Sequence, residues 1–326
     1  MAERNDSVLV TGAAGFIGGH AVRTLAGGPR RGEVIALVRP GTSAARLEPL
    51  RRAGATVSEV ELADREAMAE AFRRHRPDRV LHLAAVRGSG RGSARDYQRV
   101  NVEGTEVLLE AAARHGAARF VFCSSVGVHG TIPADQPAGP HAPLNGDSKY
   151  HRSKIRAEEA VDRFHRQGLD TCTVRPTITY GPGDDGFPAT LVRLVRSRRL
   201  PTPDPRVMVH LLDVEALCRL FAILIETGHP GGRKIIAADR DAVPLLALVD
   251  EIHRRHCGRD YPRFPALPRG ATRLLSWFLG IVGADTWRTR VRLISESWRY
   301  RPGAADGGPD YAAPDTLSTF PESMCR

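Results

Sequence analysis

The sequence is poor in features that mark several large classes of protein. Its five cysteines are scattered among 326 residues without C-x-x-C spacing, which argues against a zinc site or a disulfide framework. No stretch approaches the ~18 uninterrupted apolar residues of a membrane span. The charged start of the chain shows no signal or transit pattern. We therefore expect a cytoplasmic protein with reduced thiols, no metal site and no membrane span.

The net charge of +10 does not by itself predict a nucleic-acid partner. The arginines are spread along the whole chain, and no RNA- or DNA-binding motif accompanies them. The densest cluster is Arg193, Arg196, Arg198 and Arg199, at the end of a helical pattern. A solvated basic surface explains this cluster, and contact with an anionic substrate or an acidic carrier protein is the alternative.

Apolar runs alternate with helical patterns along most of the chain, which predicts a doubly wound parallel α/β sheet of the Rossmann type. The apolar runs are 33–38, 56–60, 79–84, 118–124, 170–175 and 233–237, and the helical patterns are about 43–53, 65–75, 104–115 and 148–167.

Three regions follow from where this alternation stops. Residues 1–180 are expected to form the dinucleotide-binding domain, which a strand near 207–240 also joins. Prolines become frequent after Gly181, so residues 181–300 are assigned largely to a smaller substrate-binding lobe. Residues 301–326 have few large apolar side chains and are expected to form a mobile tail.

A glycine-rich turn follows the first predicted strand. The run Gly12-Ala13-Ala14-Gly15-Phe16-Ile17-Gly18 separates the strand Ser7–Thr11 from a helical pattern that continues to Leu25. Glycines let the backbone approach a pyrophosphate, and the following helix presents free N–H groups to it. A structural turn in another α/β protein is the alternative, but this position favours a nucleotide site.

A Tyr-x-x-x-Lys pair lies downstream of that turn. Tyr150 and Lys154 are four residues apart, so on a helix they share a face and the ammonium can favour the ionised phenol. A tyrosine tuned in this way can transfer protons near neutral pH. The spacing also occurs by chance on solvated helices, so the pair gains weight only together with the other motifs.

In order and spacing, the motifs resemble those of extended short-chain dehydrogenases/reductases, in the NAD-dependent epimerase/dehydratase branch. The matching residues are Thr11 to Gly18, His82-Leu83-Ala84-Ala85, Asn101, Ser124-Ser125, Tyr150 with Lys154, and Arg175-Pro176. The resemblance extends from roughly Ser7 to Glu226 and implies an enzyme. It specifies the superfamily and leaves the substrate open.

The resemblance implies roles for individual residues. Ser125 would hydrogen-bond the reacting oxygen, Tyr150 would exchange its proton, and Lys154 would hold the nicotinamide ribose. The residues that would contact the cofactor are Gly12, Gly15, Phe16, Ile17, Gly18, Glu61, Leu62, Leu83, Ala84, Ala85, Asn101, Tyr150, Lys154 and Pro176. For Asn101, capping of the following helix is an equally good interpretation.

The end of the second predicted strand bears on the choice of cofactor. An NAD site usually places Asp or Glu there, whereas this sequence has Arg39. A guanidinium can pair with a 2′-phosphate, so NADP(H) is favoured and NAD(H) stays possible. The alternative for Arg39 is a solvated side chain at a strand end.

Residues near Ser125 help to choose a reaction. Family 4,6-dehydratases place an Asp-Glu pair directly after the Ser/Thr, whereas here Val126 and Gly127 follow, and neither can transfer a proton. A dehydratase of that type is therefore not expected. His129 occupies a place usually taken by tyrosine and is either a titrating group or a wall of the pocket.

Two residues point to different classes of substrate. Ile178 stands where nucleotide-sugar enzymes of the family commonly have Asn, which favours an apolar substrate. Arg206 aligns with a pyrophosphate-binding arginine of the sugar epimerases, which favours a nucleotide sugar. The glycine-rich approach that usually precedes that arginine is missing.

Three functions remain open at this point. The first is a carbonyl reductase or alcohol dehydrogenase acting on a small, mostly apolar or glycosylated molecule. The second is a sugar epimerase that keeps its cofactor, and the third is a non-catalytic cofactor-binding scaffold. By resemblance we also expect a homodimer, formed by the helix that carries Tyr150 and the helix before it.

Overall fold

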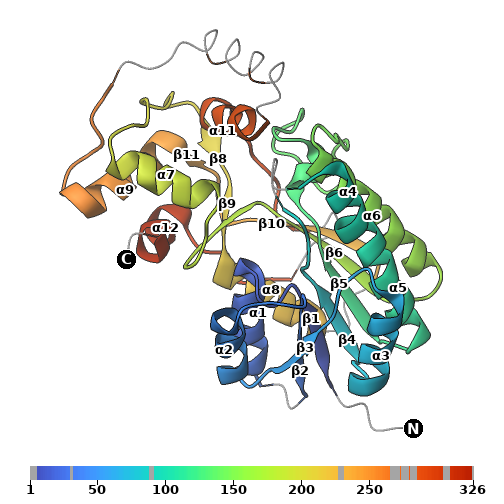
Figure 1. Ribbon diagram of the computed structural model, residues 1–326. Helices are drawn as coiled ribbons and strands as arrows, with labels where there is room; N and C mark the ends of the chain where they lie inside the picture. Colours follow the sequence, from blue (N-terminus) through green and yellow to red (C-terminus); the bar gives the residue numbers. More distant parts are fainter. Residues whose placement is uncertain are drawn as a thin grey trace.

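The computed structural model describes residues 6–29, 32–87, 92–226, 231–264, 272, 279, 285–303 and 309–324. A parallel sheet of seven strands, with helices on both faces, forms the larger part of the molecule, and a smaller lobe lies at one end of it (Figure 1). The predicted α/β fold is therefore confirmed. Within the described residues, no helix is both long and apolar enough to cross a membrane.

The sheet has the strand order β10-β6-β5-β4-β1-β2-β3, and every neighbouring pair is parallel. Its strands are β1 (Val8–Thr11), β2 (Val34–Val38), β3 (Thr56–Glu59), β4 (Arg79–His82), β5 (Arg119–Cys123), β6 (Thr171–Pro176) and β10 (Arg233–Ala237). The chain winds outward in opposite directions from β1 and β4. A crevice at the carboxyl ends of these two strands is the expected ligand site in such a sheet.

Each face of the sheet packs against its own helices. One apolar cluster joins the sheet to α1 (Phe16–Ala26), α2 (Ala44–Arg52) and α8 (Val214–Glu226). A second joins the opposite face to α3 (Arg65–His75), α5 (Gly104–Arg114) and α6 (Lys149–Arg166). Because both faces are covered, most strands are apolar throughout rather than alternating.

Three short helical segments carry the chain around the crevice. They are α4 (Ala94–Asp96), the π-helical turn η1 (Tyr97–Glu103) that leads directly into α5, and the 3-10 turn η2 (Val126–His129) after β5. The last two lie at the carboxyl ends of β4 and β5, where the sheet opens toward the smaller lobe.

The smaller lobe has a third apolar cluster of its own, which includes Tyr180, Tyr261, Trp298 and Phe320. Its strands form two pairs, β7 (Ile178–Tyr180) with β9 (Leu211–Asp213) and β8 (Met208–Val209) with β11 (Val243–Pro244). Its helices are α7 (Phe187–Arg196), α9 (Leu245–Cys257), α11 (Asp285–Ser295) and α12 (Thr316–Met324).

The described part of the C-terminal segment differs from the mobile tail expected from its composition. Phe320 of α12 is fully buried, and Thr316 donates a hydrogen bond of 2.6 Å to Asp239. The Tyr311 hydroxyl accepts a hydrogen bond of 3.0 Å from the backbone N–H of Ala238. Average composition missed this packing because a few large side chains, each in the right place, are enough to anchor the segment.

Candidate functional site

The glycine-rich turn brings three backbone segments into direct contact. Gly12 has φ of +67°, and a Cβ there would lie 2.8 Å from the backbone of Ala84. A Cβ on Gly18 would lie 2.1 Å from the carbonyl oxygen of Gly12. Side chains at these positions would separate β1, β4 and α1, so the turn keeps the N-terminus of α1 open toward the crevice.

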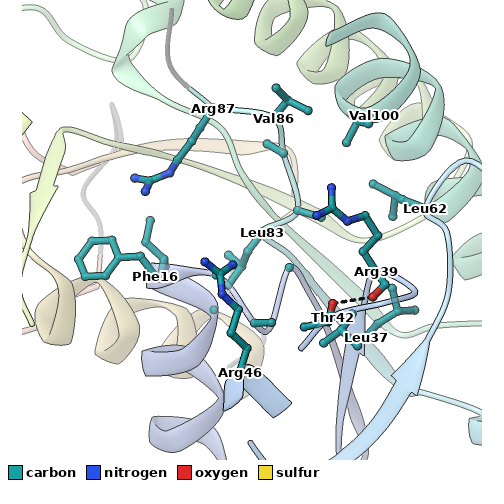
Figure 2. Close-up of a pocket in the computed structure, with 18 of the residues that line it drawn as sticks. Phe16, Leu37, Arg39, Thr42, Arg46, Leu62, Leu83, Val86, Arg87 and Val100 are labelled. Atoms are coloured by element: carbon teal, nitrogen blue, oxygen red, sulfur yellow. Dashed lines mark hydrogen bonds between the residues drawn. The ribbon is translucent and has the colours of Figure 1, made fainter. Parts of the chain in front are cut away.

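A cavity of about 300 Å³ lies over this turn. Its lining includes most of the residues expected to bind the cofactor: Gly12, Gly15, Phe16, Ile17, Gly18, Arg39, Glu61, Leu62, Leu83, Ala84 and Ala85. It also includes Thr42, Arg46 and Arg87, which the sequence had not singled out. Figure 2 shows Arg39 and Arg46 extending from the segment after β2 and from α2 into the cavity, with Arg87 on the opposite side.

The lining suits an adenine dinucleotide. The glycine backbone accommodates a pyrophosphate, and apolar side chains from the ends of β2 and β3 face the place of an adenine. Glu61 lies on this wall with its carboxylate 3.7 Å from the guanidinium of Arg99. Because the glycine turn leaves space for a pyrophosphate, the residues present fit a nicotinamide dinucleotide.

A buried polar network fixes the strand ends beneath the cavity. The Thr11 hydroxyl accepts hydrogen bonds of 3.1 Å from the N–H groups of Leu83 and Ala84 and is 2.7 Å from Nδ1 of His82. On the other side of the ring, Nε2 is 2.9 Å from the Thr105 hydroxyl. Burial, aided by the charge of Lys154, lowers the pKa of His82 to about 3, so this imidazole stays neutral.

Asn101 has a positioning role in this network and does not line the cavity. Its amide exchanges hydrogen bonds of 2.8 and 3.0 Å with the backbone of Val86 and donates a third, of 2.9 Å, to Ser153. The interpretation of Asn101 as a helix cap was wrong, because no side-chain cap is present at the start of α5. Asn101 instead connects the loop after β4 to the helix that carries Tyr150.

The helix α6 places Tyr150 and Lys154 one turn apart, close to its N-terminus. Ser148 caps this helix by accepting a hydrogen bond of 3.0 Å from the N–H of His151. The ammonium of Lys154 is buried, donates a hydrogen bond of 2.8 Å to the carbonyl of Cys123 and lies 4.7 Å from the Phe122 ring centre. This lysine is therefore bound to the end of β5.

The pKa of Tyr150 differs from the expectation that Lys154 would lower it. Burial and the nearby Cys123 raise the pKa of the phenol, and hydrogen bonding to Ser125 opposes this change. Burial likewise lowers the pKa of Lys154. In this arrangement Tyr150 is a protonated phenol, which suits it to donate a proton.

A buried ion pair supports the floor of the site. Both side chains of the pair, Arg175 of β6 and Glu158 of α6, are almost completely buried, and they form hydrogen bonds of 2.6 and 2.9 Å. Ser124 donates a further bond of 2.6 Å to Glu158. Burial raises the pKa of Glu158, but Arg175 and Ser124 hold it below its ordinary value. Arg175 belongs to a recognisable sequence motif, whereas no motif indicates Glu158 as its partner.

A second cavity, of about 220 Å³, lies between α6 and the smaller lobe. It brings together three of the expected site residues, Ser125, Tyr150 and Ile178. The rest of its lining is Val126, Gly127, Gly130, Thr131, His151, Thr177, Thr289, Leu293, Trp298 and Tyr300. The apolar segment Leu274–Val282, which its sequence predicts to be a core helix or a lid, lies outside the described residues except at Leu279.

Two expected substrate residues are not among those that line this cavity. His129 is buried, 3.2 Å from the guanidinium of Arg175 and 3.1 Å from the carbonyl of Pro143, and burial lowers its pKa. Arg206 is an exposed side chain that pairs with Asp204 at 2.9 Å. Pro176 ends β6 and is buried but is not part of either cavity wall.

The model of the NAD dependent epimerase/dehydratase family matches residues 8–233. The chain belongs to this family. The resemblance drawn from the motifs is thereby confirmed, and the chain is related to NAD-dependent enzymes.

Individual relatives within the epimerase/dehydratase family differ in activity. The chain is 33% identical to a dTDP-glucose 4,6-dehydratase of Streptomyces niveus, over 80% of each chain. It is 35% identical to a UDP-glucose 4-epimerase of Erwinia amylovora, over 52% of this chain and 51% of that one. The solved UDP-glucose 4-epimerase of Thermotoga maritima, with UDP-glucose, has a TM-score of 0.74 at 22% identity and covers 98% of this chain and 97% of its own.

Proposed function

We propose that this protein moves a hydride between a nicotinamide and a hydroxyl-bearing carbon of a small sugar-type substrate, and that it acts as an epimerase. One observation carries this proposal: Ser125 and Tyr150 face a common cavity, and buried Lys154 lies one helical turn further along α6. The named relatives support a sugar substrate better than the apolar carbonyl compound inferred from Ile178.

In this proposal the chain's own residues hold the reacting oxygen and move its proton. Ser125 and Tyr150 hydrogen-bond the substrate oxygen, and Lys154 holds the nicotinamide ribose. The nicotinamide supplies the hydride acceptor and a positive charge. Because burial raises the pKa of Tyr150, nearby positive charge is needed to ionise the phenol, and only the phenolate can then accept the substrate's proton.

The test is to incubate the purified protein with UDP-glucose and with dTDP-glucose while following the absorbance of reduced nicotinamide. An epimerase yields the 4-epimer with no net use of cofactor. Tyr150→Phe should lower the rate by about 10²- to 10⁴-fold, because proton transfer is removed. Unchanged turnover in Tyr150→Phe would instead support the non-catalytic scaffold for this pocket.

A reductase is the second candidate, because one specific observation favours it. The cavity around Tyr150 has apolar walls at Val126, Ile178, Leu293 and Trp298, and Arg206 lies outside it on the surface. A reductase should consume added NADPH in proportion to the alcohol formed from a ketone. Ketone reduction without any epimerisation would favour this candidate.

We infer NADP(H) as the preferred cofactor from the side chains around the end of β2. Arg39 and Arg46 are exposed, and both point into the cavity (Figure 2). No ion pair is recorded for either in the part of the chain that the structure describes. Thr42 lies between them, with its hydroxyl bonded to the carbonyl of Arg39 at 2.5 Å. Two guanidinium groups on one wall suit a 2′-phosphate.

Calorimetry with NADPH and NADH tests this cofactor. Removal of either guanidinium, in Arg39→Ala or Arg46→Ala, should weaken NADPH binding about 10- to 100-fold, as expected for a charge-assisted hydrogen bond. Binding of NADH should change little. Arg51→Ala, on an exposed position of α2, is the matched control. A wild-type protein that binds NADH as tightly as NADPH contradicts the inference.

The homodimer expected from the family stays a proposal. Four of the five alanines that would permit close helix contact, Ala111, Ala112, Ala157 and Ala160, are buried within the chain's own core, whereas Ala113 is exposed. The exposed sides of α5 and α6 are linked by an ion pair of 2.8 Å between Glu106 and Arg163. Sedimentation that shows a monomer at all concentrations would contradict the dimer.

A further inference from the structure

The substrate cavity contains a histidine–carboxylate pair that the hydride-transfer reaction does not use. His151 follows Tyr150 on α6, and its Nδ1 is 2.5 Å from a carboxylate oxygen of Asp147. Only 14% of the His151 side chain and 21% of the Asp147 side chain are exposed. A carboxylate at this distance favours the tautomer with the proton on Nδ1, which leaves Nε2 with a free lone pair.

The surroundings of Asp147 keep it ionised. Its other oxygen accepts a hydrogen bond of 2.9 Å from the N–H of Thr131 and lies 3.5 Å from the guanidinium of Arg292, on α11. Burial raises the pKa of Asp147, but the hydrogen bonds from His151 and Thr131 outweigh this and hold it at about 2. The pair is therefore held from α6, from the loop before α6, from the loop after η2 and from the smaller lobe.

Gly127 places the imidazole edge beside the reacting groups. A Cβ at Gly127 would lie 2.4 Å from both Cδ2 and Nε2 of His151 and 3.2 Å from the hydroxyl oxygen of Ser125. The imidazole thus uses the space that a side chain at 127 would fill. Ser125, Gly127, Tyr150 and His151 all line the same cavity. No hydrogen-bond partner is recorded for Nε2 among the residues that the structure describes.

We propose that His151 is a second proton-transfer residue of this cavity, oriented by Asp147, which removes and returns the proton on the carbon next to the substrate carbonyl. This proposal rests on the proposed function, because hydride transfer is what creates or consumes that carbonyl. The substrate class it implies is a sugar whose ketone has an acidic neighbouring C–H bond. His151 is the catalytic residue, and Asp147 is a positioning residue.

The step is balanced without any oxidant or reductant. Neutral Nε2 takes the proton, and the electron pair of the C–H bond forms a carbon–carbon double bond as the carbonyl π electrons move to oxygen. Ser125 and Tyr150 hydrogen-bond the enolate oxygen that results. The imidazolium then returns a proton to carbon and the ketone is restored. In deuterium oxide the returned proton is replaced by solvent deuterium, which makes the step visible.

The charged and titratable groups around His151 define how the step responds to pH. They are Asp147, Tyr150 and, through Asp147, Arg292. Asp147 remains ionised above about pH 2, and Tyr150 remains protonated because burial raises its pKa. Neither of these two groups therefore changes its charge near neutral pH.

The experiment uses the full-length protein with added NADPH or without it, and dTDP-4-keto-6-deoxyglucose as the ketone probe in deuterium oxide. Deuterium at the carbons beside the ketone is measured by NMR against a buffer blank, and NADPH-driven reduction of the same ketone is measured in parallel. His151→Asn keeps a donor for Asp147 but no proton acceptor. It should lower exchange by about 100-fold or more, a larger factor than any fall in NADPH-driven reduction of the same ketone.

Further variants separate catalysis from structure. Asp147→Asn should reduce exchange less than His151→Asn and shift its pH profile, because the imidazole loses its anionic partner. Gly127→Ala should displace the imidazole while His151 and Asp147 remain, which keeps the test informative should His151→Asn fail to fold. His165→Asn, near the far end of α6, is the matched control and should exchange as the wild type does.

Each outcome gives a decision. Exchange by the wild type that disappears in His151→Asn and survives in His165→Asn supports the proposal. Conversion of UDP-glucose or dTDP-glucose to its 4-epimer by a wild type that shows no exchange above the blank overturns the role of His151 and leaves the proposed function standing. Exchange that persists in His151→Asn also overturns it. A wild type that neither exchanges deuterium nor forms a 4-epimer from either sugar nucleotide rejects both proposals.

Discussion

The cofactor cavity and the substrate cavity are made of different parts of the polypeptide. The cofactor cavity is shaped mainly by backbone, where the glycine turn touches the ends of β1 and β4. The substrate cavity is shaped by side chains that come from η2, α6, β7, α11 and the segment around Trp298. An added carbon atom in the first disturbs three elements together, whereas a change in the second alters one wall. We therefore expect sharp responses to substitution in the first and graded responses in the second.

The largest effect is expected beneath the substrate cavity, where one substitution should cost far more than the graded responses expected of the cavity wall. Arg175→Met leaves the Glu158 carboxylate buried without its main partner, which should lower the free energy of unfolding by about 3–5 kcal/mol. Denaturant unfolding followed by circular dichroism measures this loss. Arg254→Ala, which removes an exposed ion pair, is the control and should change stability little.

The ion pair between Arg175 and Glu158 should also make the stability of the protein depend on pH. Arg175 and Ser124 hold the pKa of Glu158 below its ordinary value, so the pair's contribution is present above the unfolded pKa of about 4.3 and is lost as the pH falls. The difference in stability between wild type and Arg175→Met should therefore shrink below about pH 4. A difference that stays constant down to pH 3 would contradict this origin.

Next in size is the effect of one methyl group in the glycine turn. Gly18→Ala places a Cβ 2.1 Å from the Gly12 carbonyl oxygen, a backbone atom that cannot move aside alone. We expect a cost of about 1–3 kcal/mol, as for overpacking, felt in nicotinamide affinity as well as in stability. Calorimetric titration with NADPH measures it. Gly139→Ala has no atom within 4 Å of the new Cβ, is not at a positive φ and lies outside the cofactor cavity, so it serves as a control for affinity.

A smaller and more local effect is expected in the wall of the substrate cavity. Ile178→Val removes one methylene from a half-buried side chain and should cost about 1 kcal/mol or less in stability. Its main consequence should be a changed KM for the sugar substrate, with the Kd for cofactor unaltered. An altered cofactor Kd would show that the two cavities are coupled.

The smallest effect is expected at Arg206. Its guanidinium is exposed and pairs with Asp204, so Arg206→Ala should change stability by less than about 0.5 kcal/mol. If the substrate does not reach this side chain, the KM for UDP-glucose should also stay the same. A rise in that KM would show that Arg206 turns toward a bound pyrophosphate, and it would strengthen the nucleotide-sugar assignment.

Much of the cofactor cavity could be predicted from the sequence because the motifs that form it are local. The glycine turn, Arg39 and the strand ends at Glu61 and Leu83 are each defined by a few consecutive residues, and strand–helix alternation places them at one edge of the sheet. Arg46 was missed although it lies one turn into α2. Arg39 lies before α2, so its position in the sequence does not reveal which side of that helix faces the cavity.

The substrate cavity and the residues beneath it could be predicted less well, because their contacts join segments that are distant in the sequence. The partnership of Arg175 with Glu158 and the alignment of His151 beside Gly127 depend on how α6 lies against β6 and η2, and no local pattern records that. In the sequence, Gly127 was interpreted only as a position where family dehydratases carry an acid. In the structure it leaves space for the imidazole of His151. The C-terminal segment was missed for a related reason, since Tyr311 gains its partners from the main sheet and Phe320 from the smaller lobe only when the chain is folded.

The strand β10 has a consequence for protein engineering. After building β7, α7, β8 and β9 in the smaller lobe, the chain passes through α8 and returns to pair β10 with β6 at the edge of the main sheet. The smaller lobe is therefore built from segments on both sides of β10 in the sequence. Exchange of substrate lobes between family members cannot be achieved with a single recombination point, and a chimera that keeps both hydrophobic cores intact needs at least two matched junctions.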